Sequence, residues 1–453
     1  MDANRSRSFL ARIKHDIPEC LPIDVVDRCK EAIIDYLGVT YAGRAFLGEA
    51  PYFAIVDELD GRGNGLAIAT GRGVPMKDAV FLNGLHSHAL DCDDGVNAGI
   101  VHLGSPILSL LLPLACREGA SGSDLIRSAV SGYEAAWTLA YSIQPTHKLM
   151  GFHATGTCGM LGAIVSGACL LGYGDEETFR AFSVGCLSAS GFLKAIEDGS
   201  GLKPYNVAKA SLMALVSLQM ARARIAVPDD VMSGGRGFLK MMAGSEEVEI
   251  VPPLFEGRYA IMRTYTKPYA ACRYCHPAIE AAIRLREESS ALLEDVDAID
   301  VLTYGLAVRG HDHIEIEGAP SAKMSIPYGV AVGFSCGKAG LAEYSEAMSK
   351  NRHILSLCRK VSVTADDRMT SAFPEKTIAS VRLRLKNGSV FETVVDHPLG
   401  EPENPLGFER VCKKFREMAD YAGKDALWQN RVVSAVENIE EDLPILLDLL
   451  KEA

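Results

Sequence analysis

The 453-residue sequence lacks an excess of positive charge, and this excludes two large classes of partner. Acidic side chains outnumber basic ones by 58 to 46, and the formal net charge is −12. Binding to nucleic acid or to an anionic membrane requires a basic face that displaces counterions. We therefore expect no nucleic acid and no membrane as partners, while a local basic pocket stays compatible with the composition.

Cysteine is too sparse for a disulfide scaffold, and no segment looks like a leader or an anchor. Several of the twelve cysteines lie inside apolar runs, as reduced core thiols do. The opening MDANRSRSFLARIKHD has no long apolar stretch of the signal-peptide kind. The most apolar run, residues 158–173, is followed directly by acidic residues, which favours a buried helix over a membrane span. These features predict a soluble cytoplasmic protein.

Several catalytic motifs are also missing. There is no P-loop, no G-x-S-x-G elbow and no cysteine set at iron–sulfur spacing. Residues 59–75 hold five glycines, but their spacing is not that of a dinucleotide-binding loop and no crossover unit surrounds them. We expect this segment to form a hairpin that projects from a helical bundle.

What the sequence does contain predicts a mainly α protein with a smaller α+β domain. From about residue 22 to 224 the apolar positions recur at helical spacing, with Gly38 a suitable helix stop and Ser121 and Ser123 capping candidates. Small residues crowd several of these helices and would let their backbones approach closely. Beyond about residue 265 the pattern alternates with period two, and Asn387-Gly388 marks a tight hairpin.

The predicted boundaries follow from this change of pattern. An all-helical domain covers residues 1–265 and is completed by C-terminal helices within 401–453. Residues 266–400 form the α+β domain, with helices expected around 278–288 and 326–336 between its strands.

One segment, HSHALDCDDGVNAGIVH, concentrates three imidazoles and three carboxylates. It holds His86, His88, Asp91, Asp93, Asp94 and His102. Such a group can perform acid–base chemistry or bind a metal, with His86 and His88 as a possible zinc pair. Equally, the carboxylates cap helices and the histidines occupy satisfied core positions. The pattern alone leaves these interpretations open.

A second segment, GFHATGTCGMLG, places His153, Thr155 and Thr157 among glycines. If a helix begins here, its backbone N–H groups would hold a carboxylate well. Alternatively, this is a glycine-rich helix entry with a capping threonine.

Two further segments are basic and lie in apolar surroundings. LKPYNVAKA carries Lys203, and TKPYAACRYCHPAIEA carries Lys267, Arg273 and His276. Buried cations are costly unless paired, so these serve either in ion pairs, with Asp91 or Asp93 as partners, or in recognition of substrate carboxylates. The single C-x-x-C pair of the second segment is weak evidence for a metal or redox site, and free thiols are expected there.

Together these stretches resemble the MmgE/PrpD family, which includes 2-methylcitrate dehydratase, cis-aconitate decarboxylase and iminodisuccinate epimerase. The resemblance runs nearly end to end. It is carried by HALDCDD with Asp91, the downstream His102, GFHATGTCGMLGA with His153, LKPYNVAKAS with Lys203, KPYAACRYCHPAIEA with Lys267, and SAKMSIPYGVAVG with Tyr328. It implies a large helical domain, an α+β lid domain, a homodimer, and an active site between the domains without metal or organic cofactor.

The resemblance also implies a chemistry, which is removal of a proton from carbon next to a carboxylate of a small di- or tricarboxylate. Preorganised cations and N–H donors stabilise the charge that develops in such a step. The implied acid–base groups are His102 and His153, with Asp91 orienting one of them or accepting a substrate hydroxyl. The implied carboxylate ligands are Lys203, Lys267 and Arg273, with substrate contacts also from Tyr328, Thr155 and His276.

The leading activity is a hydro-lyase that resembles 2-methylcitrate dehydratase. Two departures from the family pattern keep the outcome open: Gly95 replaces a frequent threonine, and His102-Leu103-Gly104-Ser105 replaces the usual His-Pro-Ser. Decarboxylation and epimerisation can start from the same carbanion-like state and are the alternatives. A non-catalytic helical scaffold, in which the clusters are only ion pairs, is the alternative outside the family.

Overall fold

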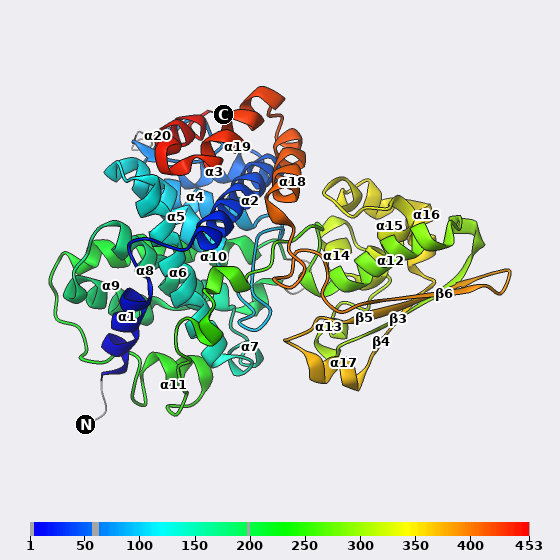
Figure 1. The fold of residues 1–453 in the computed structure, drawn as a ribbon, viewed down its shortest axis with the longest axis horizontal. Helices are drawn as coiled ribbons and strands as arrows, with labels where there is room; N and C mark the ends of the chain where they lie inside the picture. The colour runs from blue at the N-terminus through cyan, green and yellow to red at the C-terminus, as the bar shows by residue number, and fades with distance from the viewer. Residues whose placement is uncertain (1–3, 57–62, 197–199, 453) are drawn as a thin grey trace. The chain divides into compact units, whose positions relative to one another are not determined.

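The computed structural model describes residues 4–56, 63–196 and 200–452. The chain divides into two compact units: unit 1 comprises Met1–Thr266 and Gly407–Ala453, and unit 2 comprises Lys267–Leu406. Unit 1 is helical and unit 2 combines helices with a sheet (Figure 1), which confirms the predicted fold class. The helices of unit 1 are α1 (Arg5–Asp16), α2 (Ile23–Leu47), α3 (Ala50–Ile55), α4 (Met76–His88), α5 (Gly104–Glu118), α6 (Gly122–Ile143), α7 (Thr146–Leu149), α8 (Ala154–Leu170), α9 (Asp175–Ser188), α10 (Lys203–Ala221), α11 (Phe238–Ala243), α18 (Gly407–Tyr421), α19 (Ala426–Glu437) and α20 (Ile439–Leu449).

Close backbone contact between helices organises unit 1, as the small residues predicted. Where α6 crosses α8, Gly132 and Gly162 face each other, and a Cβ at either position would lie within 2.9 Å of the other glycine's carbonyl oxygen.

The predicted N-terminal cap of α6 is present, because the Ser121 hydroxyl accepts the Asp124 N–H at 3.1 Å. The second capping candidate, Ser123, lies inside α6.

We expect Gly162→Ala to destabilise the protein by about 2 kcal/mol or more, because its Cβ would lie 2.5 Å from the Gly132 oxygen and 2.6 Å from the Ala136 Cβ. Denaturant unfolding at equilibrium measures this change. The control is Gly201→Ala, where a Cβ meets nothing within 4 Å, and its effect should stay within about 0.5 kcal/mol. Equal stabilities of the two variants would contradict the close crossing.

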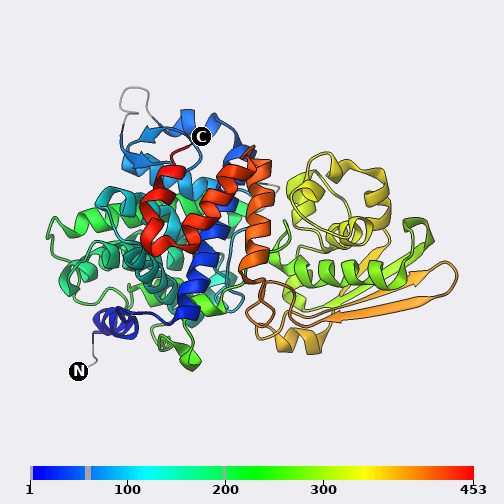
Figure 2. The ribbon, with the colours of Figure 1, turned by 45° about the horizontal axis from the view of Figure 1, so that its top comes forward.

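The predicted helix stop at Gly38 is wrong. Helix α2 continues through Gly38 to Leu47 and ends at Gly48, whose φ of 70° suits a residue without a side chain. Gly38 instead serves packing: a Cβ there would lie 3.2 Å from the Cα of Phe415 on α18. The glycine therefore lets α18, from the C-terminal part of the chain, lie directly against α2 (Figure 2).

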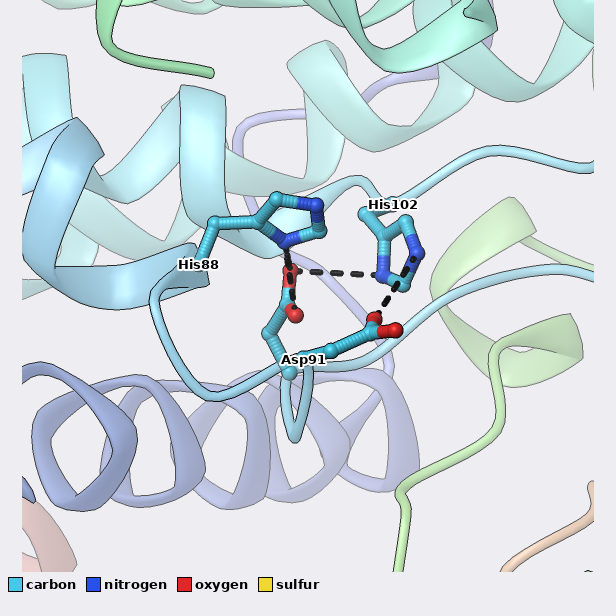
Figure 3. Close-up of side chains that lie close together, drawn as sticks. His88, Asp91 and His102 are labelled. Atoms are coloured by element: carbon cyan, nitrogen blue, oxygen red, sulfur yellow. Dashed lines mark hydrogen bonds and ion pairs between the residues drawn. The ribbon is translucent and has the colours of Figure 1, made fainter. Parts of the chain in front are cut away.

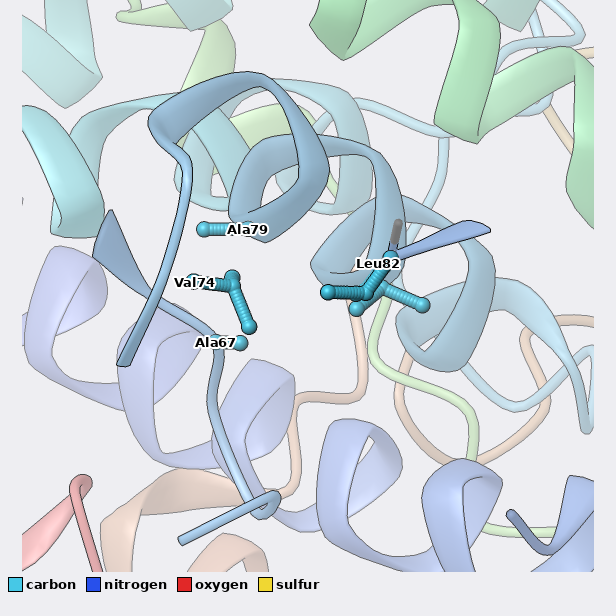
Figure 4. Close-up of a cluster of buried hydrophobic side chains, with 5 residues drawn as sticks. Ala67, Val74, Ala79 and Leu82 are labelled. Carbon is cyan, nitrogen blue, oxygen red and sulfur yellow. The ribbon is translucent and has the colours of Figure 1, made fainter. Parts of the chain in front are cut away.

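The glycine-rich segment forms the expected hairpin, and part of it packs against α4. Strands β1 (Gly65–Leu66) and β2 (Gly73–Val74) pair antiparallel. Ala67 and Val74 are buried and pack with Val56 and with Ala79 and Leu82 of α4 (Figure 4). Residues 59–62, including Gly61, lie outside the described residues.

Unit 2 contains a four-stranded sheet in the order β4-β3-β5-β6. The pairing β3–β4 is parallel and the other two pairings are antiparallel, with β5 and β6 joined through the predicted turn at Gly388, whose φ is 86°. Helix α12 packs against β5, β6 and α15 (Figure 2). The elements are β3 (Val296–Thr303), β4 (Val361–Ala365), β5 (Ala379–Leu385), β6 (Val390–Val395), α12 (His276–Ser289), α13 (Gly305–Val308), α14 (Ala319–Lys323), α15 (Ile326–Cys336), α16 (Arg352–Cys358) and α17 (Asp367–Ala372).

None of the helices within 4–56, 63–196 and 200–452 combines the length and the apolar character that crossing a membrane requires.

Candidate active site

The loop between α4 and α5 brings two histidines onto one buried carboxylate. His88 is the last residue of α4, and its Nδ1 lies 2.9 Å from both carboxylate oxygens of Asp93. The Nδ1 of His102, which lies just before α5, is 3.3 Å from the same carboxylate. Figure 3 shows the side chains of His88, Asp91 and His102 turned toward one another. His88, at the end of α4, and His102, just before α5, thus share the charge of one carboxylate.

The two neighbouring histidines keep the Asp93 side chain ionised. Burial would raise its pKa, but the imidazoles of His102 and His88 keep the pKa of Asp93 well below its usual range. The Ser105 hydroxyl donates a further bond of 2.8 Å to Asp93. A negative charge that is buried and already hydrogen-bonded can stabilise a positive charge on an adjacent imidazole.

The hydrogen bonds of His102 fix which of its nitrogens is basic. Its Nδ1 lies 2.7 Å from the backbone oxygen of Asp94, which can only accept, so Nδ1 carries the proton. In the neutral ring the lone pair is therefore on Nε2. That atom lies 3.8 Å from Asp91 Oδ1, beyond hydrogen-bond distance. His102 thus presents an acceptor nitrogen toward Asp91.

Asp91 and Lys203 form an ion pair next to that nitrogen. Lys203 is the first residue of α10, and its ammonium lies 2.7 Å from Asp91 Oδ1 although 112 residues separate the two. Asp91 has a φ of 54°, which turns the chain sharply after α4. Both side chains keep some exposure, 19% for Lys203 and 15% for Asp91. The sequence left this ion pair and carboxylate recognition open, and the structure shows the ion pair.

His153 completes the cluster, and in its neutral ring the proton is on the other nitrogen from that of His102. Its ring centroid is 6.4 Å from that of His102. Its Nδ1 accepts a hydrogen bond of 3.2 Å from the amide of Asn206, one turn into α10, so the proton of the neutral ring is on Nε2. Burial, helped by the Lys203 charge, lowers the pKa of His153 well below its usual value. His153 is therefore a neutral hydrogen-bond donor through its Nε2, whereas His102 offers an acceptor nitrogen.

Helix α8 begins directly after His153, as the sequence allowed, but neither predicted threonine caps it. The Thr155 hydroxyl accepts the backbone N–H of His102 at 3.1 Å, and the Thr157 hydroxyl bonds with the Nε2 of His147. Thr155, a predicted substrate contact, therefore holds the backbone of a cluster histidine in place.

Asp94 and Lys414 hold the loop itself. The Asp94 carboxylate accepts bonds from the Tyr133 hydroxyl at 2.6 Å and from the Gly104 N–H at 2.9 Å. Burial raises its pKa. Lys414 of α18 donates to the carbonyl of Cys92 at 2.8 Å. These bonds to α6, α5 and the C-terminal segment fix the positions of the neighbouring catalytic candidates.

His86 does not take part in the cluster. It is fully buried on α4, and neither ring nitrogen makes a hydrogen bond to any part of the chain that the structure describes. Burial, and to a lesser extent the charge of Arg44, lowers its pKa to about 3. The pair of His86 and His88 considered for zinc therefore does not converge.

We expect His86→Leu to stabilise the protein, and more so in acid. An unfolded histidine with an ordinary pKa binds a proton as the pH falls below about 6.5, whereas native His86 stays neutral down to about pH 3, so it costs stability between these values. Removing it should flatten this pH dependence by about 2 kcal/mol at pH 5 relative to pH 8. Urea unfolding at both pH values measures this, with the exposed His353→Leu as control. A wild-type pH dependence in His86→Leu would contradict the assignment.

The side chains of the histidine–aspartate cluster could also offer ligands to a metal. His88, Asp91, Asp93 and His102 each bring one ligand atom, all within 4.8 Å of one another. However, Lys203 already places a cation against Asp91, and the Nδ1 of His88 is engaged by Asp93. The arrangement of these groups fits proton transfer better than it fits a metal centre.

The predicted site residues of unit 2 form their own contacts. Arg273 pairs with Glu401 at 2.5 Å and donates to His276 Nδ1 at 2.9 Å, so His276 carries its proton on Nε2, which donates to the Ala271 carbonyl. Tyr328 is buried and donates its hydroxyl proton to the Glu343 carbonyl at 2.9 Å. Lys267 is the first residue of this unit. Their roles toward a substrate stay predictions.

A cavity of about 450 Å³ lies elsewhere in unit 1, between α1 and helices α6, α8 and α9. Its lining includes Arg7, Lys14, Arg127 and Phe179, and none of the predicted site residues belongs to it. This cavity therefore does not coincide with the candidate active site.

Comparison with known proteins supports the family that the motifs resemble. Residues 10–251 match the MmgE/PrpD N-terminal domain, and residues 269–438 match the MmgE/PrpD C-terminal domain. The chain belongs to the MmgE/PrpD family, which includes lyases such as dehydratases and decarboxylases. A curated relative, the cis-aconitate decarboxylase-like protein oryM of Aspergillus oryzae, is 22% identical over 425 residues, covering 89% of this chain and 88% of the relative.

Three residues of the cluster are not among the predicted site residues. His88 is predicted only as a possible zinc partner of His86, Asp93 only as a possible ion-pair partner of a buried cation, and Asn206 carries no prediction. The spacing of His88 and Asp93 could have been informative, because a histidine that ends a helix can meet a carboxylate in the following turn. No sequence signal indicates that Asn206 orients His153.

Proposed function

We propose that this protein is a lyase that removes a proton from carbon next to a carboxylate of a small di- or tricarboxylate, most closely a hydro-lyase resembling 2-methylcitrate dehydratase. The observation that carries the proposal is the basic Nε2 of His102 beside the Asp91–Lys203 pair. A weak carbon acid needs both a positioned base and nearby positive charge, and these residues supply both.

In this mechanism His102 Nε2 accepts the proton from carbon. The imidazolium that forms is stabilised by Asp93, 3.3 Å from its Nδ1, and by Asp91, 3.8 Å from its Nε2. Lys203 and the Nε2–H of His153 face the negative charge that develops on the substrate carboxylate. The neutral state of His153 suits it to donate a hydrogen bond. The leaving hydroxyl can take the proton that His102 has accepted, so that water departs.

Decarboxylation is the second candidate, and the name of the Aspergillus relative favours it. Dehydration and epimerisation pass through a carbanion-like state formed by loss of a proton, whereas decarboxylation passes through one formed by loss of carbon dioxide. The products distinguish the three outcomes. Proton NMR of the purified protein with citrate, 2-methylcitrate, cis-aconitate and iminodisuccinate would identify the product in each case. The proposal predicts loss of water from one hydroxy tricarboxylate, and it fails if all four compounds stay unchanged. The predicted homodimer is checked separately by light scattering during size-exclusion chromatography.

A further inference from the structure

Unit 2 contains a thiol–imidazole pair that the proposed reaction does not use. The Sγ of Cys272 lies 3.5 Å from the Nε2 of His311, within the range of a sulfur hydrogen bond. The two residues are 39 positions apart and belong to different segments. The backbone N–H of Cys272 bonds to the Lys323 carbonyl at 2.9 Å, so the cysteine is held in place relative to its partner.

The hydrogen bonds of His311 determine the direction of proton transfer. Its Nδ1 lies 3.0 Å from the carbonyl oxygen of Arg309, which can only accept, so this nitrogen carries the proton. The neutral ring therefore presents the lone pair of Nε2 to the thiol. The ring also packs edge-on against Tyr274, with centroids 5.2 Å apart. A nucleophile, a base and a group that orients the base are thus arranged in sequence, as in activated cysteines.

Other thiols of the chain provide the contrast. Cys336 is partly exposed, as Cys272 is, but burial and the nearby Glu343 raise its pKa. Burial raises the pKa of Cys358 to about 12. Such thiols are protonated at neutral pH and react slowly. Cys272 combines partial exposure with a base in contact.

We propose that Cys272 is a nucleophilic modification site for small soft electrophiles, namely alkyl halides and activated alkenes, with His311 as the base that accepts its proton. With an alkyl halide, the sulfur–carbon bond forms while the halide leaves with the electrons of the carbon–halogen bond, and the thiol proton moves to His311 Nε2. With an activated alkene, the π electrons shift to the neighbouring carbon, which then takes that proton from His311. This inference does not depend on the proposed lyase activity.

The test is alkylation of the intact protein by iodoacetamide at pH 7, followed by mass spectrometry of peptides that contain individual cysteines. Cys272 should react at least about tenfold faster than the exposed Cys20, and its advantage over Cys336 should be larger still, because its proton has an acceptor in contact. His311→Gln should remove the advantage of Cys272 over Cys20 and leave the rate of Cys20 unchanged. Cys272→Ser confirms the peptide assignment.

Two results would overturn the proposal. One is a wild-type rate for Cys272 that equals or falls below that of Cys20. The other is an unchanged Cys272 rate in His311→Gln. If that variant does not fold, the ratio of the two rates in the wild-type protein decides alone.

Discussion

Replacing His102 by glutamine is expected to lower kcat by about 10²- to 10⁴-fold, the contribution of a well-placed general base. Glutamine is similar in size and can still donate a hydrogen bond to the Asp94 carbonyl, but it offers no basic nitrogen at the position of Nε2. Because only the base is lost, the loss should fall on kcat more than on KM. Steady-state kinetics on the substrate identified by NMR, together with the melting temperature, measures the effect.

The matched control is His147→Gln. His147 is also a buried histidine of unit 1, and burial lowers its pKa to about 4. Its ring is held by the Met242 carbonyl and the Thr157 hydroxyl, outside the cluster. This variant should lose stability but keep its turnover per folded molecule. Wild-type turnover in His102→Gln, or an equal loss of kcat in both variants, would rule out His102 as the base.

The second large effect is expected from Lys203→Gln, which removes the cation next to the proposed reaction centre. We expect kcat/KM to fall by about 10²- to 10³-fold, because charge that develops on the substrate carboxylate loses its electrostatic partner. The change also leaves Asp91 without its ion pair of 2.7 Å, which by itself would weaken folding or orientation.

A double-mutant cycle with Asp91→Asn separates these two roles, with Asp91→Asn as the reference because Asp91 itself belongs to the proposed site. If Lys203 only neutralises Asp91, adding Lys203→Gln to Asp91→Asn should cost no further activity. If Lys203 stabilises the substrate, the double variant should have a lower kcat/KM than Asp91→Asn, which is the result we expect. Lys14→Gln is the control, because Lys14 forms a comparable ion pair of 2.6 Å with Asp175 at the exposed surface. Its activity should match wild type.

The fold class was predictable because the spacing of apolar residues along the sequence indicates which side chains are buried. Helical spacing in residues 22–224 and alternation near Asn387-Gly388 follow directly from which side chains face a core. Gly38 shows the limit of this reasoning. A glycine ends a helix when it adopts a positive φ, but it stays inside one when another helix needs the space, and only the position of Phe415 on α18 decides between them.

The candidate site was predictable in its residue types but not in its pairings. The sequence indicates His102 and Asp91 by a segment rich in imidazoles and carboxylates, His153 by a glycine-rich segment and Lys203 by a basic one. The structure brings the four together in unit 1. Which nitrogen carries a proton depends on contacts with the Asp94 carbonyl and the Asn206 amide, which only the folded chain defines. For the same reason, the sharing of Asp93 by two histidines could not be deduced from spacing alone.

In the proposed reaction, His102 makes and breaks a bond between carbon and hydrogen next to a substrate carboxylate. The most direct test of this role is to let the reaction reach equilibrium in heavy water and to measure deuterium at that carbon by NMR. We predict that wild-type protein introduces solvent deuterium there and that His102→Gln does not over the same time. Turnover without deuterium at that carbon, or incorporation by His102→Gln at the wild-type rate, would contradict the claim.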